Sequence, residues 1–103
     1  MRQAERRIFK RFKVRPVLCS TNPELRGGCV LKNVSLNGAF FLYPTPPPIG
    51  AQVHFDFAEP PLEGYLLHGK VVRHNFGRRR GFAVDFQSPR PKLLRAVYCN
   101  DLV

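Results

Sequence analysis

The stretch QVHFDF, residues Gln52–Phe57, carries the clearest structural signal in this sequence. Apolar and polar residues alternate strictly through it, so a β-strand here would place Val53, Phe55 and Phe57 on one face and the polar residues on the other. A period of two over six residues is typical of a strand that is buried on one side only. The stretch therefore predicts a sheet with one face packed against a core and the other face in water.

Five further segments have strand character, and turn-forming sequences rich in Gly, Pro and Asn separate them. They cover residues 12–18, 29–34, 39–43, 65–74 and 82–86. In the last of these segments, Phe82 and Phe86 are expected to face the core and Ala83 to face water. Because Pro16 cannot donate a hydrogen bond to a neighbouring strand, we expect it at a sheet edge or on an unpaired side.

After the last strand the apolar period lengthens. Leu93, Leu94, Val97 and Leu102 are spaced as the stripe of a short amphipathic helix over residues 90–103. Six short strands joined by turns and followed by one helix predict an all-β domain, a six-stranded antiparallel barrel or sandwich whose end the helix covers. No β–α–β unit is evident, which argues against a parallel dinucleotide-binding sheet.

The size and composition indicate one folded domain over residues 1–103, with 44% hydrophobic residues and nine Phe. No apolar run approaches the ~20 residues that a membrane span needs, and no apolar segment follows the basic N-terminus as a secretory signal requires. Three cysteines without a C-x-x-C pair predict reduced thiols and a cytoplasmic protein. Cys19 and Cys29 could face each other across a hairpin, but we expect two half-buried small residues instead.

The net charge of +10, from 17 basic and 7 acidic residues, predicts an anionic partner: nucleic acid, nucleotide, acidic protein or anionic lipid. The charge is uneven along the chain. Residues 1–11 are strongly basic and show no periodicity, which predicts a flexible arm that leads into a barrel over residues 12–87. The second basic cluster, Arg78–Arg80, lies in a predicted hairpin loop, where it is either a solvated surface or part of a binding site.

No residues in the sequence form a recognisable catalytic set. Ser35 has no neighbouring histidine or carboxylate to activate it, and the few carboxylates are spaced as outward-facing strand and turn residues. The histidines share no metal-ligand spacing with the cysteines, so no metal or other cofactor is expected. These observations favour a binding module over an enzyme.

Five residues together suit a ligand that carries both guanine and phosphate. Arg7 and Arg11 each offer a planar fork that pairs with guanine O6 and N7, or with phosphate. Asn33 offers both a donor and an acceptor to a guanine edge. The Ser35 hydroxyl and the backbone amides of a turn at Gly38 can hold a phosphate oxygen, and Gly38 would permit a positive φ there.

The pattern R-x-x-x-R at Arg7–Arg11, followed by N-x-S-x-x-G at Asn33–Gly38, resembles the PilZ domain. Gly69–Arg73 and Gly81–Phe86 resemble its late strands, so the resemblance covers residues 5–87. It implies a six-stranded antiparallel barrel that binds the bacterial second messenger cyclic di-GMP. It also implies that the two arginines grip guanine and phosphate, while the second motif contacts a guanine edge and phosphate from the barrel surface. Asn33 stands where Asp is commoner in the family.

The resemblance carries three further expectations. Arg6, directly before the first motif, is linked in the family to ligand stoichiometry and implies an intercalated ligand dimer. Ligand binding is expected to order the N-terminal arm over the barrel and to change the surface offered to a downstream protein partner. Arg73 or His74 could flank a base, or both could be plain surface residues.

Two rival functions remain open from the sequence. A basic small barrel that binds nucleic acid would explain the charge but not Asn33, Ser35 and Gly38. A ligand-independent PilZ adaptor would explain the fold, although the intact motifs argue against it.

Overall fold

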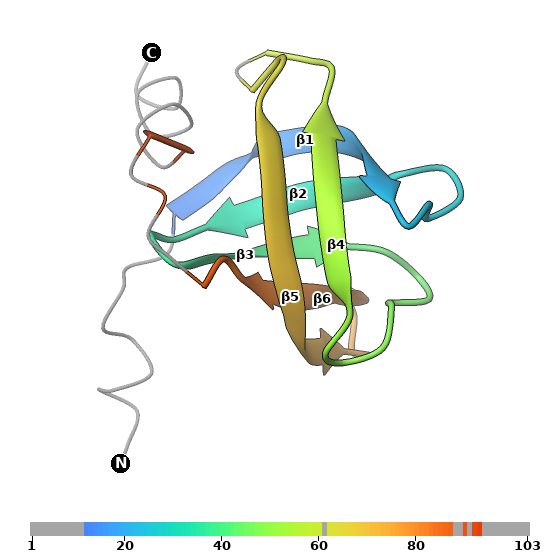
Figure 1. Cartoon of the computed structure of the whole chain (residues 1–103). Helices are drawn as coiled ribbons and strands as arrows, with labels where there is room; N and C mark the ends of the chain where they lie inside the picture. Colours follow the sequence, from blue (N-terminus) through green and yellow to red (C-terminus); the bar gives the residue numbers. More distant parts are fainter. Residues whose placement is uncertain (1–11, 61, 88–89, 91, 94–103) are drawn as a thin grey trace.

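The computed structural model describes residues 12–60, 62–87, 90 and 92–93. Its six strands are β1 (Phe12–Asn22), β2 (Cys29–Val34), β3 (Gly38–Leu42), β4 (Gln52–Phe57), β5 (Leu66–Asn75) and β6 (Gly81–Asp85). They form a closed barrel in the order β1-β2-β3-β6-β5-β4, in which every neighbouring pair is antiparallel (Figure 1). The predicted six-stranded antiparallel barrel is therefore confirmed. The predicted arm over residues 1–11, and most of the predicted helix over 90–103, lie outside the described residues.

The barrel interior is filled by stacked aromatic rings. Val53, Phe55 and Phe57 are buried, as the alternation in β4 predicts. The ring of Phe55 is stacked on that of Phe41, with centroids 4.1 Å apart and planes 3° apart. The Phe82 ring lies close to both, 5.6 Å from Phe41 and 6.3 Å from Phe55. Such stacks contribute ~0.5–1.5 kcal/mol per pair beyond the burial of their apolar area. Among the described residues, no helix has the length and apolar character to cross a membrane.

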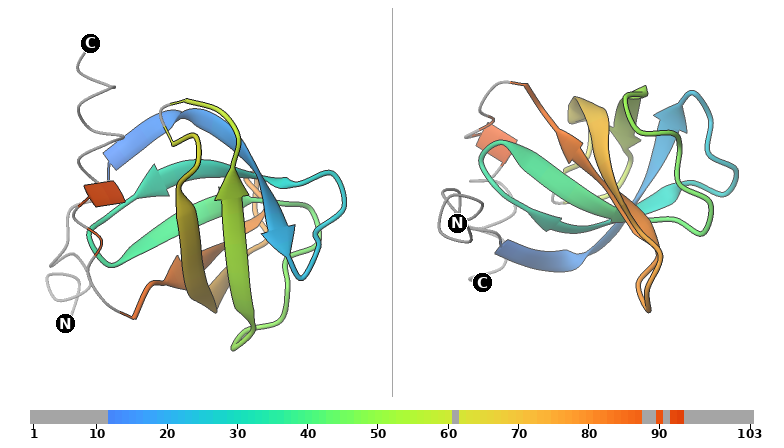
Figure 2. Two further views of the ribbon diagram at one scale, coloured as in Figure 1. Left: turned by 45° about the horizontal axis from the view of Figure 1, so that its top comes forward. Right: turned by 90° about the horizontal axis from the view of Figure 1, so that it is seen from below.

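Three register shifts interrupt the regular pairing of the strands. In β2, Leu31 is opposite Phe41 and Asn33 is opposite Phe40, so Lys32 is an extra residue. A second shift lies between Val71 and Arg73 in β5, and a third lies between residues 13 and 17 in β1. The bulges in β2 and β5 each insert one extra residue, which reverses the face on which the following residues lie. Figure 2 shows how strongly the strands bend as they close the barrel.

The bulge in β1 explains the position of Pro16. Of the two expected positions, the sheet edge is not found, because the six described strands form a closed barrel. The other is confirmed: Pro16 lies exposed on an unpaired part of β1, in the irregular stretch between Lys13 and Val17. Beyond the bulge, Val17 is buried and Leu18 is 49% exposed.

Cys19 and Cys29 are paired in the core, which corrects the expectation of two half-buried, separate residues. They lie directly opposite each other on β1 and β2, both are buried, and their sulfur atoms are 3.5 Å apart. The Cys19 thiol also donates to the Cys29 carbonyl oxygen at 3.3 Å. The hydrogen bond with Cys19 and burial raise the pKa of the Cys29 thiol far above its ordinary value. Both thiols are free, as expected from the cysteine spacing.

Candidate ligand-binding site

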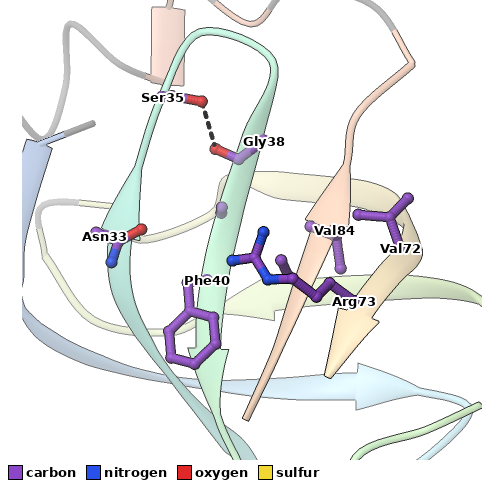
Figure 3. Close-up of a pocket in the computed structure, with 9 residues that line it drawn as sticks. Asn33, Ser35, Gly38, Phe40, Val72, Arg73 and Val84 are labelled. Carbon is purple, nitrogen blue, oxygen red and sulfur yellow. Dashed lines mark hydrogen bonds between the residues drawn. The ribbon is translucent and has the colours of Figure 1, made fainter. Parts of the chain in front are cut away.

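Asn33, Ser35 and Gly38, the three residues of the second sequence motif, line one cleft on the outer surface of the barrel. The cleft has a volume of about 120 Å³, and Phe40 and Arg73 also line it (Figure 3). Asn33 comes from β2, the motif turn joins β2 to β3, and Arg73 comes from β5. The remaining predicted site residues, Arg6, Arg7 and Arg11, lie outside the described residues.

The floor of the cleft is a row of directly paired residues on four adjacent strands. Asn33 on β2 is opposite Phe40 on β3, Phe40 is opposite Ala83 on β6, and Ala83 is opposite Arg73 on β5. In Figure 3 the Arg73 side chain extends across β6 towards Phe40 and Asn33. The small side chain of Ala83 leaves room for this crossing.

Two β-bulges place Asn33 and Arg73 on the outer face. Leu31 and Val71 are fully buried, and strict alternation would turn the residues two positions later, Asn33 and Arg73, into the core as well. Because one extra residue intervenes in each strand, Asn33 and Arg73 face outwards instead. The bulges thus bring an amide and a guanidinium group to the same cleft, and sequence alternation gives no sign of this. From the sequence alone, Arg73 could be either a ligand contact or a plain surface residue.

Ala83 was expected to face water, but it is only 7% exposed. Its position on the outer face of β6 is as expected. It is buried because it lies between the larger side chains of Phe40 and Arg73 in the same row. The expectation failed because alternation predicts which way a residue faces and not what its neighbours cover.

Hydrogen bonds within the β2–β3 turn fix its shape. The Ser35 amide donates to the Gly38 carbonyl oxygen at 2.8 Å, and the Ser35 hydroxyl donates to the same oxygen at 3.3 Å. The Phe86 amide donates to the Asn37 carbonyl oxygen at 2.8 Å and ties the turn to the end of β6. The Asn37 side-chain oxygen is buried and has no hydrogen-bond partner in the described part of the chain.

Gly38 is required by close packing rather than by a positive φ. Its φ is not positive; among the described glycines, positive values occur at Gly27, Gly28, Gly50 and Gly64. A Cβ added at Gly38 would lie 2.5 Å from the Val84 carbonyl oxygen, because β3 and β6 approach each other closely at this point. The absence of a side chain at Gly38, the last residue of the motif, therefore allows the turn to pack against β6.

The cleft combines groups that recognise a planar base and an anion. The Asn33 side-chain amide can donate and accept hydrogen bonds, and so can the Ser35 hydroxyl. Arg73 supplies a planar cation next to the Phe40 ring. The described lining residues include no acidic side chain, so the local charge favours an anionic ligand. Among the described residues, no group of three or more His, Cys, Asp or Glu is placed to hold a metal ion.

The closed barrel and its surface cleft define the class of the protein, a small six-stranded antiparallel β-barrel domain. A family model described as PilZ domain matches residues 2–98, nearly the whole chain. The chain belongs to the PilZ domain family, as the two sequence motifs indicate. PilZ domains in general bind cyclic di-GMP and serve as binding or adaptor domains rather than enzymes. Neither a search of curated proteins nor a search of solved structures found a match.

Proposed function

We propose that this chain is a receptor for cyclic di-GMP, which binds at the cleft between the β2–β3 turn and Arg73. The observation that carries this proposal is the convergence of Asn33, Ser35 and Gly38 in a single cleft on the outer face of the barrel. The proposed site is completed by three arginines of the N-terminal segment. These are Arg6, Arg7 and Arg11.

Each described group has a role that its chemistry supports. The Asn33 amide can pair with a guanine edge, although without the charge that an aspartate would bring. The Arg73 guanidinium can stack on a guanine ring or pair with a phosphate, beside the Phe40 ring. The Ser35 hydroxyl donates to the Gly38 carbonyl in the free protein, and its rotation would turn that donor towards a phosphate oxygen.

The small size of the cleft supports a proposed second layer over the ligand. Its volume of about 120 Å³ is well below the ~300–1,000 Å³ of pockets that enclose a drug-sized ligand. Cyclic di-GMP, with two guanines and two phosphates, would place only one part in the cleft and lie across the barrel surface. In this proposal the N-terminal segment covers the ligand, with Arg7 and Arg11 on guanine and phosphate, and becomes ordered as it does so. Arg6 stabilises a second, intercalated ligand molecule.

Isothermal titration calorimetry with cyclic di-GMP tests this proposal. We expect saturable binding, with a stoichiometry of two ligands per chain that falls to one in Arg6→Ala. Arg7→Ala, Arg11→Ala and Asn33→Ala should each weaken binding by about tenfold, since a good contact to a guanine edge contributes ~1–3 kcal/mol. Lys70→Ala is the matched control, because Lys70 is exposed on β5 and does not line the cleft.

Three outcomes would contradict the proposal. The absence of binding at ligand concentrations of tens of micromolar would favour a ligand-independent adaptor. Affinity unchanged in Arg7→Ala or Arg11→Ala would contradict the proposed site. Tight binding of random RNA or DNA that weakens steeply with salt, without binding of cyclic di-GMP, would favour a nucleic-acid-binding barrel.

The proposed output is a changed surface presented to a protein partner. Ordering of the N-terminal segment would alter the outer face around β2, β3 and β6, where the cleft lies. Comparing backbone NMR spectra of the free and ligand-bound protein would show whether signals of residues 1–11 become dispersed on binding. Unchanged signals in that segment would contradict the ordering step while leaving ligand binding itself intact.

A further inference from the structure

A second concave surface lies on the outer face of the same strands, at the end away from the β2–β3 turn. It has a volume of about 560 Å³ and is formed by the β1–β2 loop, the end of β3 and the β5–β6 loop. In Figure 1 these loops lie at the opposite ends of β2 and β3 from the turn that carries Ser35. We call this surface the arginine groove. The proposed cyclic di-GMP site uses none of its residues.

The floor of the arginine groove is a row of aliphatic side chains. Leu18 on β1 is directly opposite Val30 on β2, and Val30 is directly opposite Leu42 on β3. Leu18 is 49% exposed, although regular packing would bury a leucine of a small barrel. Val30 and Leu42 are partly exposed as well. The aliphatic floor is therefore open to a side chain from outside.

The rim of the groove is strongly cationic. Arg26 lies on the β1–β2 loop, and Arg78, Arg79 and Arg80 lie on the β5–β6 loop. All four are exposed, and the described residues that line the groove include no acidic side chain. Four guanidinium groups around one opening create a positive potential that attracts and orients carboxylates.

Contacts on both loops hold the rim in place. The Tyr43 hydroxyl donates to the Arg26 carbonyl oxygen at 3.0 Å and ties the β1–β2 loop to the end of β3. On the other side, the Arg80 guanidinium lies 5.6 Å from the centroid of the Phe76 ring, a cation–π contact across the β5–β6 loop. The Phe76 ring in turn packs edge-on against His74 at 5.3 Å. These contacts restrain the Arg26 backbone and the Arg80 side chain, so these two parts of the rim lose less conformational entropy when a partner binds.

We propose that the arginine groove docks an acidic segment of a partner protein, with one aliphatic or aromatic side chain inserted onto the Leu18–Val30–Leu42 floor. The four arginines supply charge complementarity to the acids, and the floor supplies the apolar anchor site that protein interfaces use. Single-stranded nucleic acid fits less well, because its bases stack on several aromatic rings, whereas the floor is aliphatic and Tyr43 is the one aromatic residue among the described lining residues. The inference does not depend on cyclic di-GMP binding.

The test uses the full chain, immobilised and without cyclic di-GMP. A phage-displayed library of random peptides is selected for binding to it. Enriched peptides are expected to be acidic and to share a large apolar residue. The affinity of a synthetic labelled peptide from the leading family is then measured by fluorescence anisotropy. The double variant Arg78→Gln/Arg79→Gln and the single variant Leu18→Ser should each weaken binding by about tenfold or more, as central contacts do.

The matched control is Lys70→Gln/Lys92→Gln, which removes the same charge from two exposed lysines outside the groove and should leave peptide affinity unchanged. Enrichment of peptides without acidic residues would overturn the proposal, as would peptide binding that survives both groove variants. Tight binding of labelled single-stranded RNA or DNA that is lost in Arg78→Gln/Arg79→Gln would assign the groove to nucleic acid instead. Because no cyclic di-GMP is present, each of these outcomes leaves the calorimetric test of that ligand unaffected.

Discussion

Gly38→Ala tests why the binding motif ends in glycine. A Cβ at this position would lie 2.5 Å from the Val84 carbonyl oxygen, whereas close carbon–oxygen contacts between strands lie at about 3.3 Å. The substitution therefore requires β3 and β6 to separate by about 0.8 Å. Hydrogen bonds between strands, about 2.9 Å long, weaken when stretched by that much. Overpacking of this kind typically costs ~1–3 kcal/mol, and we expect a loss in the free energy of unfolding within that range.

Two other glycines of the same barrel provide a graded comparison. At Gly77 an added Cβ would meet only the Asn75 side-chain oxygen, at 3.4 Å, so Gly77→Ala should change stability by less than about 0.5 kcal/mol. At Gly81 the added Cβ would overlap the Phe41 carbonyl oxygen and lie 2.9 Å from the Phe40 ring. Gly81→Ala should therefore be the most destabilising of the three variants.

Urea denaturation followed by circular dichroism measures the free energy of unfolding of all three variants. Gly77→Ala is expected to lower it least, Gly38→Ala more, and Gly81→Ala most. Titration of folded Gly38→Ala with cyclic di-GMP should also show weaker binding, because the turn that carries Ser35 is displaced. Equal stability of Gly38→Ala and Gly77→Ala would refute the argument that β3 and β6 exclude a side chain at this point.

Three further predictions concern the cleft and the core. Arg73→Ala should lower cyclic di-GMP affinity by about tenfold in calorimetry. Arg73→Lys should retain only part of the wild-type affinity, because lysine lacks the planar group. Equal affinity of the wild type and both variants would exclude Arg73 from the site. Deleting Lys32 should remove the β2 bulge and leave Asn33 directly after the buried Leu31, where regular alternation keeps Asn33 outside and Val34 inside. The free energy of unfolding in urea should therefore change by less than about 0.5 kcal/mol, whereas a loss of ~1–3 kcal/mol, the cost of a buried, unpaired amide, would contradict this account of the bulge. Folding raises the pKa of the Cys29 thiol, so the protonated thiol stabilises the folded state. This stabilisation is fully present below the ordinary thiol pKa of about 8.5, and above that pH it falls by at most about 1.4 kcal/mol per pH unit. Denaturation at pH 8 to 10 should therefore show a steeper decline for wild type than for Cys29→Ala, and parallel declines would contradict it.

The strands and the inner face could be predicted because their cause is local. Strict alternation in Gln52–Phe57 places Val53, Phe55 and Phe57 inside, and all three are buried. The motif at Asn33–Gly38 likewise identified three residues that line one cleft. Turn residues with restricted backbone preferences separate the strands, so the number of strands followed from the sequence pattern as well.

The outer face could not be predicted in the same way, because β-bulges change its phase. Nothing in the composition of β2 or β5 marks Lys32 or Val72 as an extra residue, yet these bulges decide that Asn33 and Arg73 lie outside. The pairing of Cys19 with Cys29 depends on the register between β1 and β2, which is set by contacts distant in sequence. For the same reason Gly38 suggested a turn with positive φ, although the actual constraint is the Val84 carbonyl oxygen on β6.

The closed barrel has a consequence for how this protein can acquire new partners. Because the six described strands pair all the way round, none of them offers a free edge on which another chain could extend the sheet. Recognition must instead use side chains of the outer face, while the stacked Phe41, Phe55 and Phe82 rings that hold the fold together lie on the inner face. Substitutions on the two faces act on different properties. Partner specificity can therefore diverge between related barrels at little risk to folding.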